Sequence, residues 1–298
     1  MNAAEPAGNE NKHLGLIAAL CAYTFWGMFP LFFQLIKDID ALEILMHRMV
    51  WSVPFAGILI CFRRQIGDVI QAFKKPKVLV MLCIAAVSIA LNWFIYTWAV
   101  THDRILEASL GYYINPLMYV IAGVFILKEP LRPMQTIAVS LATISVTVLT
   151  IWQGAFPWIP LSLAGLFTAY GYIRKTIDVG ALPGLFVEVV MLSPIAIIYI
   201  LWLAKNGNSV FLSGGVSQDI YLVLLGPLTV IPLTLFSIAA RRLPLITLGF
   251  LQYIGPTVQF VVGVFLGEAF TLAHGVSFGL IWIALAVFTV DSVRAVRA

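Results

Sequence analysis

The sequence predicts an all-α integral membrane protein of about ten transmembrane helices, built as two inverted five-helix repeats. Three observations carry this prediction: an apolar composition, apolar runs of spanning length, and segments of the first half that recur in the second. Of the 298 residues, 61% are hydrophobic and 11% are charged, and the mean hydropathy is +0.98. Soluble domains carry roughly 25% charged residues and expose no large apolar patches. Lipid is therefore the solvent that suits this chain.

Each spanning helix needs about 20 mostly apolar residues. The runs that meet this requirement are 14–36, 42–62, 78–100, 105–127, 134–151, 157–173, 183–204, 219–240, 244–266 and 272–290. The links between them are short and leave no room for a soluble domain. We therefore divide the chain into four parts: an N-terminal tail (1–13), a first repeat (14–151), a second repeat (157–290) and a C-terminal tail (291–298).

The distribution of lysine and arginine predicts the orientation. With the N-terminus in the cytoplasm, the segments on that side hold 14 of the 18 basic residues, and the opposite loops hold only Lys37, Arg104 and Lys205. Cytoplasmic loops are enriched in basic residues, so we expect both termini on the cytoplasmic side of a bacterial inner membrane. The basic residues form no continuous stripe of the kind that follows nucleic-acid phosphates, and no nucleic-acid partner is expected.

The chain repeats itself. Residues 41–60 and 181–200 are identical at 8 of 20 positions without a gap, and Pro54 aligns with Pro194. Two further pairs of segments match: 109–116 with 247–256, and 123–129 with 263–268. Because each repeat holds an odd number of spans, the second copy must be inverted relative to the first. Inverted repeats are typical of secondary transporters, which hold a solute near the midplane between their halves.

Two alternatives to transport stay open at this point. An old gene duplication leaves a non-transporting scaffold, and a sparse polar site inside the bilayer is compatible with an enzyme that acts on a lipid-linked substrate. The sequence shows no Walker A loop, no HExxH zinc motif and no GxSxG elbow, each of which carries a specific chemistry. We therefore favour a secondary transporter of a small organic solute, with no cofactor, no metal and no ATP. A homodimer is compatible with the sequence.

Ionisable and polar residues inside the outer half of the second, third and fourth spans form one predicted cluster: Glu43, His47, Arg48, Asn92, Tyr96 and Glu107. Charged groups in spans are costly and usually face a cavity or a partner. Glu43 and His47 are four residues apart and share a helix face. We expect Arg48 to pair with Glu107 or Glu43. Such a pair is either part of a functional site or a lock between three helices.

Glu188 is the ionisable residue of the seventh span, and Arg48 aligns with it in the repeat. No basic residue lies nearby in the sequence. A buried acid without a partner favours its neutral form, so this group is a candidate for binding and releasing protons near neutral pH. The alternative is an acid hydrated at the inner mouth of a cavity.

Amide and aromatic side chains surround two prolines within spans. Proline removes a backbone donor, and spanning helices tolerate this where neighbours or water satisfy the freed groups. A cavity for a polar solute is therefore expected from Tyr96, Tyr113, Asn115, Gln252 and Tyr253. Helix kinks with local capping are the alternative explanation. The candidate hinges are Gly27, Gly111, Pro116, Gly249 and Pro256.

Four motifs are specific in combination: Glu43-x-x-x-His47-Arg48-x-x-Trp51-Ser52, Asn92-Trp93-x-x-Tyr96-x-Trp98-Ala99, the run from Glu107 to Leu117, and Leu251-Gln252-Tyr253-Ile254-x-Pro256-Thr257. They resemble the RarD group of the EamA family, within the drug/metabolite transporter superfamily. The resemblance extends from about Leu14 to Asp291. It implies a central cavity lined mainly by the third, fourth, eighth and ninth spans, with the fifth and tenth at the periphery. It also implies solutes such as amino acids, other metabolites, sugar phosphates or drugs, and no catalytic residue.

Overall fold

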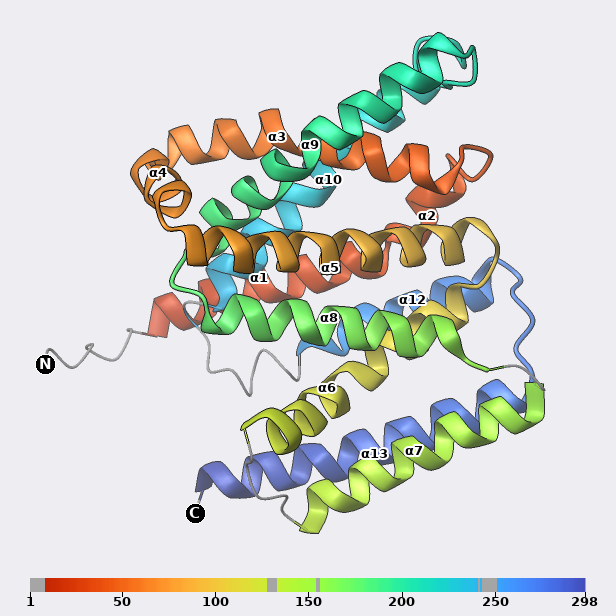
Figure 1. The fold of residues 1–298 in the computed structure, drawn as a ribbon. Helices are drawn as coiled ribbons and strands as arrows, with labels where there is room; N and C mark the ends of the chain where they lie inside the picture. The colour runs from red at the N-terminus through yellow and green to blue at the C-terminus, as the bar shows by residue number, and fades with distance from the viewer. Residues whose placement is uncertain (1–8, 128–132, 154–155, 241, 243–250, 298) are drawn as a thin grey trace, which may run out of the picture.

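The computed structural model describes residues 9–127, 133–153, 156–240, 242 and 251–297. All secondary structure in these ranges is helical, and the long helices lie side by side (Figure 1). The helices are α1 (Asn9–Gly27), α2 (Phe29–Gln34), α3 (Ala41–Phe62), α4 (Ile66–Lys74), α5 (Pro76–Thr101), α6 (Ile105–Leu127), α7 (Pro133–Gln153), α8 (Trp158–Thr176), α9 (Ala181–Lys205), α10 (Val216–Ala240), α12 (Ile254–Phe265) and α13 (Leu272–Arg297). The all-helical prediction is confirmed for this part of the chain.

Six stretches of helix among the described residues are long and apolar enough to cross a membrane: His13–Gln34, Ala41–Phe62, Pro76–Thr101, Ala181–Lys205, Val216–Phe236 and Leu272–Asp291. Two shorter apolar helices, Thr136–Trp152 and Ile254–Phe265, lie in α7 and α12. The predicted spans 105–127 and 157–173 fall on α6 and α8. The chain is therefore a multi-pass helical membrane protein.

The helices run between two ends of the bundle. α1 begins and α13 ends at the same end, which we call the terminus end (left in Figure 1), and the opposite end is the distal end. α3 starts at the distal end and α9 at the terminus end. Arg48 and Glu188 each lie seven residues after the start of their helix. At 1.5 Å per residue both are about 10 Å deep, from opposite ends.

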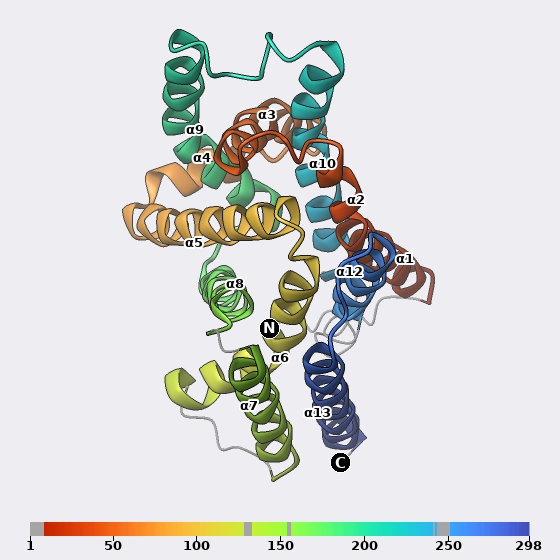
Figure 2. The same ribbon diagram turned by 90° about the vertical axis from the view of Figure 1, so that its right-hand side faces the viewer.

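Helices from the two halves of the chain pack against each other. α3 packs on α9, α6 on α12, and α7 on α13. α1 contacts α10 and α12, while α8 contacts α5 and α6. In both views α7 and α13 form a pair at one edge of the molecule (Figures 1 and 2). Each of these pairs joins a helix from residues 9–153 to one from residues 158–297.

Two features differ from the predicted spans. The run 14–36 is broken at Met28, because Pro30 lacks the N–H that would continue the helix and instead opens α2. The link 63–77 contains α4, which the search for spanning runs missed because it is only nine residues long. Its Ile66, Ile70 and Phe73 are exposed. This apolar face, followed by lysines, suits a helix that lies in the membrane interface.

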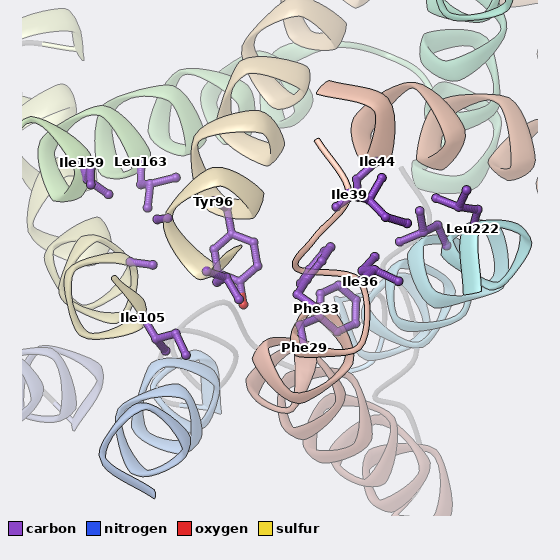
Figure 3. Packing of buried hydrophobic residues seen from close by; sticks show 14 residues of the cluster. Phe29, Phe33, Ile36, Ile39, Ile44, Tyr96, Ile105, Ile159, Leu163 and Leu222 are labelled. Carbon is purple, nitrogen blue, oxygen red and sulfur yellow. The ribbon is translucent and has the colours of Figure 1, made fainter. Parts of the chain in front are cut away.

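A central core joins the two halves (Figure 3). Phe29 and Phe33 of α2 pack with Tyr96 of α5, and residues of α8 and α10 complete the cluster. Tyr96 lies between the phenylalanines on one side and Ile159 and Leu163 on the other. The polar residues described next lie beside this aromatic core.

Candidate functional site

Arg48 is held at the boundary between the halves. Asp40 caps α3, because its side chain accepts the N–H groups of Leu42 (2.9 Å) and Glu43 (3.3 Å). This start point places Arg48 about two turns into the bundle, where it is only 4% exposed. Its Nε donates to Thr229 Oγ1 at 2.8 Å. The bond connects α3 to α10, a helix of the second half.

Aromatic rings surround the rest of the guanidinium. Its Cζ lies 4.1 Å from the ring centroid of Trp93 and 5.7 Å from that of Phe29, within the range of cation–π attraction. Arg48 Nη1 is buried and has no hydrogen-bond partner among the described residues. The guanidinium is therefore positioned from its faces and from Nε, and keeps a free donor.

Three polar side chains lie on the neighbouring helices. Asn92 is completely buried, and its Nδ2 donates to the carbonyl of Leu163 at 2.9 Å. Tyr112 Oη donates to Asn92 Oδ1 at 3.2 Å. The Tyr96 ring packs 5.8 Å from Tyr112, and its buried hydroxyl has no partner within the described chain. The rings of Tyr96 and Tyr112 lie in the neighbourhood of the Arg48 guanidinium.

A small cavity opens beside Arg48. Its volume is about 10 Å³, which is room for about one water molecule. Its walls are Phe29, Phe32, Phe33, Arg48, Leu225, Leu228 and Thr229. Sites for whole organic ligands measure roughly 300–1,000 Å³. A whole organic ligand therefore does not fit beside Arg48 in this conformation.

The prediction that Arg48 pairs with Glu43 or Glu107 is wrong. Glu43 Oε1 accepts from Ser209 Oγ (3.1 Å) and from the N–H of Val210 (2.9 Å), and lies 3.9 Å from His47 Nε2. These contacts tie α3 to the α9–α10 link. Because the 209–210 segment already hydrogen-bonds the Glu43 carboxylate, this group does not pair with Arg48, which lies five residues further along α3.

Glu107 is also engaged elsewhere. Its Oε1 accepts from Arg104 Nε at 2.7 Å and lies 2.6 Å from Arg104 Nη2. Arg104 precedes α6 by one residue, so the pair forms within the first helical turn. The predicted cluster is therefore divided into three parts, of which Arg48, Asn92 and Tyr96 remain together.

Two adjacent tyrosines of α6 face different neighbours. Neighbouring helical residues point about 100° apart, so Tyr112 faces the Arg48 side whereas Tyr113 faces α12 and α13. Tyr113 Oη lies 2.6 Å from Thr257 Oγ1, and its ring stacks on Tyr253 at 6.3 Å. Of the two, Tyr112 belongs to the neighbourhood of the cavity, although the sequence analysis named Tyr113.

Asn115 lies between α6 and α8. It is completely buried, and its Oδ1 accepts from Thr168 Oγ1 at 3.0 Å, while Nδ2 has no partner among the described residues. Pro116 follows within α6, whose ribbon bends partway (Figures 1 and 2). Gln252 is half-buried and directly precedes Tyr253 in the chain. Gly249 lies outside the described residues.

The other candidate hinges lie at tight contacts. A Cβ at Gly27 would come within 2.6 Å of Val258 Cβ, and one at Gly111 within 3.0 Å of the carbonyl oxygen of Pro160. Pro256 accepts a 2.7 Å hydrogen bond from Ser109 Oγ through its carbonyl. At Gly27, Gly111 and Pro256, helices from opposite halves of the chain are in close contact.

Glu188 has partners that the sequence analysis missed. Its Oε1 lies 3.5 Å from Arg174 Nη1, and its Oε2 accepts from Tyr170 Oη at 3.3 Å. Arg174 follows the apolar run 157–173, but α8 continues to Thr176, and Arg174 Nη2 donates to the carbonyls of Gly180 and Ala181 at the start of α9. Gly184 provides the space for this guanidinium, since a Cβ at position 184 would overlap it. The expectation of an unpartnered acid is wrong.

Glu268 makes a polar contact that the sequence motifs did not predict. It lies in the loop after α12, outside the spanning helices, and both carboxylate oxygens accept the N–H of Leu106 at 3.1 Å. Burial raises the pKa of Glu268 to about 7, although the N–H groups of Leu106 and Ile105 oppose this shift. The acids Glu107 and Asp103 raise the pKa further.

Comparison with known proteins gives consistent matches. A model of the EamA-like transporter family matches residues 13–151. A Pseudomonas aeruginosa protein named uncharacterized transporter PA0485 is 43% identical over 289 residues, covering 96% of this chain and 97% of that protein. Protein RarD of Streptomyces exfoliatus is 42% identical over 292 residues, covering 98% and 92%. A crystal structure at 20% identity has the same fold, with a TM-score of 0.60 over 94% of this chain and 98% of the other.

The multi-pass helical fold and these relatives define a membrane transporter rather than an enzyme. The chain belongs to the EamA-like transporter family. The resemblance to RarD proteins that the four sequence motifs indicated is confirmed over nearly the whole chain.

Proposed function

We propose that the protein is a secondary transporter of small organic solutes, which alternates access by rocking residues 14–151 against residues 157–290. The observation that supports this proposal most is the bond between Arg48 and Thr229, because it joins buried polar side chains from the two halves of the chain. Secondary transporters with inverted repeats hold their solute at such a boundary.

The pairing of helices supports inverted repeats. The segments that align in sequence pack on each other, α3 on α9 and α6 on α12. The fifth and last predicted spans show a reciprocal contact: Ser145 Oγ donates to the carbonyl of Ser277 at 3.0 Å, and Ser277 Oγ donates to that of Ser145 at 3.3 Å. Reciprocal bonds of this kind are expected across a pseudo-twofold axis. We further propose that the chain has ten spans and that its terminus end faces the cytoplasm.

Opening requires contacts between the halves to break. At the distal end, Glu43 binds the 209–210 segment and Glu268 binds the start of α6. Separation of the halves at this end would break both contacts and widen the cavity beside Arg48. We infer proton coupling through Glu188, whose partner Arg174 is available to compensate the carboxylate; exchange of one solute for another is the alternative mode.

Counterflow in proteoliposomes tests transport. Vesicles loaded with mixed amino acids and related metabolites are expected to take up labelled tracer, and Asn115→Ala should lose this uptake while remaining folded. Ser88→Ala is the matched control, because its hydroxyl bonds to Ile84 of its own helix. Uptake that is equal in wild type and Asn115→Ala would contradict a role for Asn115 at the site. Absence of counterflow for every pool would count against the transported classes proposed.

A further inference from the structure

Arg48 is a buried cation without an acidic partner among the described residues. Acids of the spanning helices α3, α6, α9 and α10 are engaged with other groups: Glu43 with His47 and the 209–210 segment, Glu107 with Arg104, Glu188 with Arg174, and Asp219 with the N–H of Leu212. Burying a charge without a counter-ion is expensive, and a hydroxyl and aromatic rings compensate it only in part. A protein that retains such a cation at a solute boundary retains an electrostatic attraction for an anion.

Two buried hydrogen-bond donors also favour an anionic ligand. Arg48 Nη1 and Tyr96 Oη are both buried, and neither has a hydrogen-bond partner among the described residues. Unmet buried donors are costly, and native structures normally satisfy them. A carboxylate accepts several hydrogen bonds at once and pairs well with the guanidinium edge. One carboxylate group could engage both donors as the halves rearrange.

The walls of the cavity specify the remainder of the ligand. Apart from Arg48 and Thr229, the lining is aromatic or aliphatic. Such walls favour an apolar group attached to the charged one. A phosphate would bring about two negative charges at neutral pH, for which the lining offers a single cation.

We propose that Arg48 binds the carboxylate of the transported solute, so that the protein carries monocarboxylates with an apolar substituent. This assignment rests on the transport function proposed above and narrows it to a class of solute. Tyr96 supplies a second hydrogen bond, and Thr229 positions the guanidinium through Nε. Because Arg48 and Thr229 belong to opposite halves, the bound anion lies where movement of the halves can release it.

The test compares carboxylates with their neutral amides. Purified protein is titrated with 3-phenylpropionate and 3-phenylpropanamide, and with butyrate and butyramide, while tryptophan fluorescence is followed. Trp93 is an internal reporter, since its ring lies 4.1 Å from the Arg48 guanidinium. The acids should bind roughly tenfold or more tightly than the amides, because a charged hydrogen bond contributes about 1.5–3 kcal/mol.

Variants locate the effect. Arg48→Gln should remove the preference for acids, while Arg63→Gln, an exposed arginine just after α3, should keep it. Tyr96→Phe removes one hydroxyl and serves if Arg48→Gln does not fold; it should weaken the acids selectively. Equal binding of acids and amides, or no binding of either, overturns the proposal. Counterflow of amides without acid preference would leave transport standing and refute the carboxylate site, whereas acid-selective binding without flux would do the reverse.

Discussion

The carboxylate of Glu268 caps the first turn of α6 by accepting the backbone N–H of Leu106 with both oxygens, each at 3.1 Å. A helix N-terminus presents unpaired N–H groups and favours negative charge. Here the cap comes from 162 residues away in the sequence and from the other half of the chain. The Glu268 side chain therefore caps the N-terminus of α6 and also joins the two halves of the chain at the distal end.

Replacing Glu268 with alanine should lower the free energy of unfolding by about 1 kcal/mol, the usual contribution of a cap. Thermal melting in detergent micelles measures this, and Glu268→Gln should lose less because its amide oxygen still accepts a bond. An alanine variant as stable as wild type would show that the cap is replaced by water.

The same residue should make stability depend on pH. Because the folded pKa of about 7 lies above the ordinary value of 4.5, the folded state binds the proton more tightly between these values. The free energy of unfolding should therefore fall as the pH rises from 4.5 to 7 and level off above 7. Melting curves of Glu268→Gln should lack this part of the slope. An identical slope in the variant would assign it to other groups.

Gly184→Ala should displace Arg174 from Glu188. The added Cβ overlaps the guanidinium, so the ion pair is lost without touching either partner. Removing one member of a buried pair costs about 3–5 kcal/mol, and Arg174→Ala should destabilise by a similar amount. The double variant should be no worse than either single variant, which a double-mutant cycle measures. Gly165→Ala in α8, where nothing lies within 4 Å of the new Cβ, should be close to neutral.

Glu188→Gln should uncouple transport from a proton gradient. If Glu188 carries the proton, counterflow of solute should persist in this variant while the stimulation by an imposed pH gradient disappears. Arg174→Lys, which retains a positive charge, should keep part of that stimulation. Transport by Glu188→Gln with an unchanged response to the gradient would remove Glu188 from the coupling mechanism and favour exchange.

Gly27→Ala should force α1 away from α12. The new Cβ would lie 2.6 Å from Val258 Cβ and 3.0 Å from the carbonyl oxygen of Gly255. Overpacking of this kind costs about 1–3 kcal/mol, and transport should fall if α1 and α12 move against each other as proposed. Gly57→Ala is the control, since its nearest neighbour, Phe186, lies at an ordinary 3.5 Å. Restored packing in Gly27→Ala/Val258→Gly, which removes the Cβ that the new methyl group meets, would confirm the cause.

The sequence was sufficient for features that depend on local composition. Apolar runs of spanning length marked the helices, and the motifs marked the family. The partners of the charged residues could not be found this way, because Arg48 and Thr229 are 181 positions apart. Periodicity also cannot tell which side of α6 meets the cavity, so Tyr113 was chosen although Tyr112 faces Arg48's neighbours. Arg174 was misplaced because helix ends extend beyond the apolar run that identifies them.

The reciprocal contact between Ser145 and Ser277 has a consequence for tolerance to mutation. Each hydroxyl donates to the backbone carbonyl of the other residue, and a carbonyl survives any substitution. A change at one serine therefore deletes one bond and leaves the second intact. The contact between α7 and α13 is therefore lost in two separate steps, and after the first step one hydrogen bond still joins the two helices.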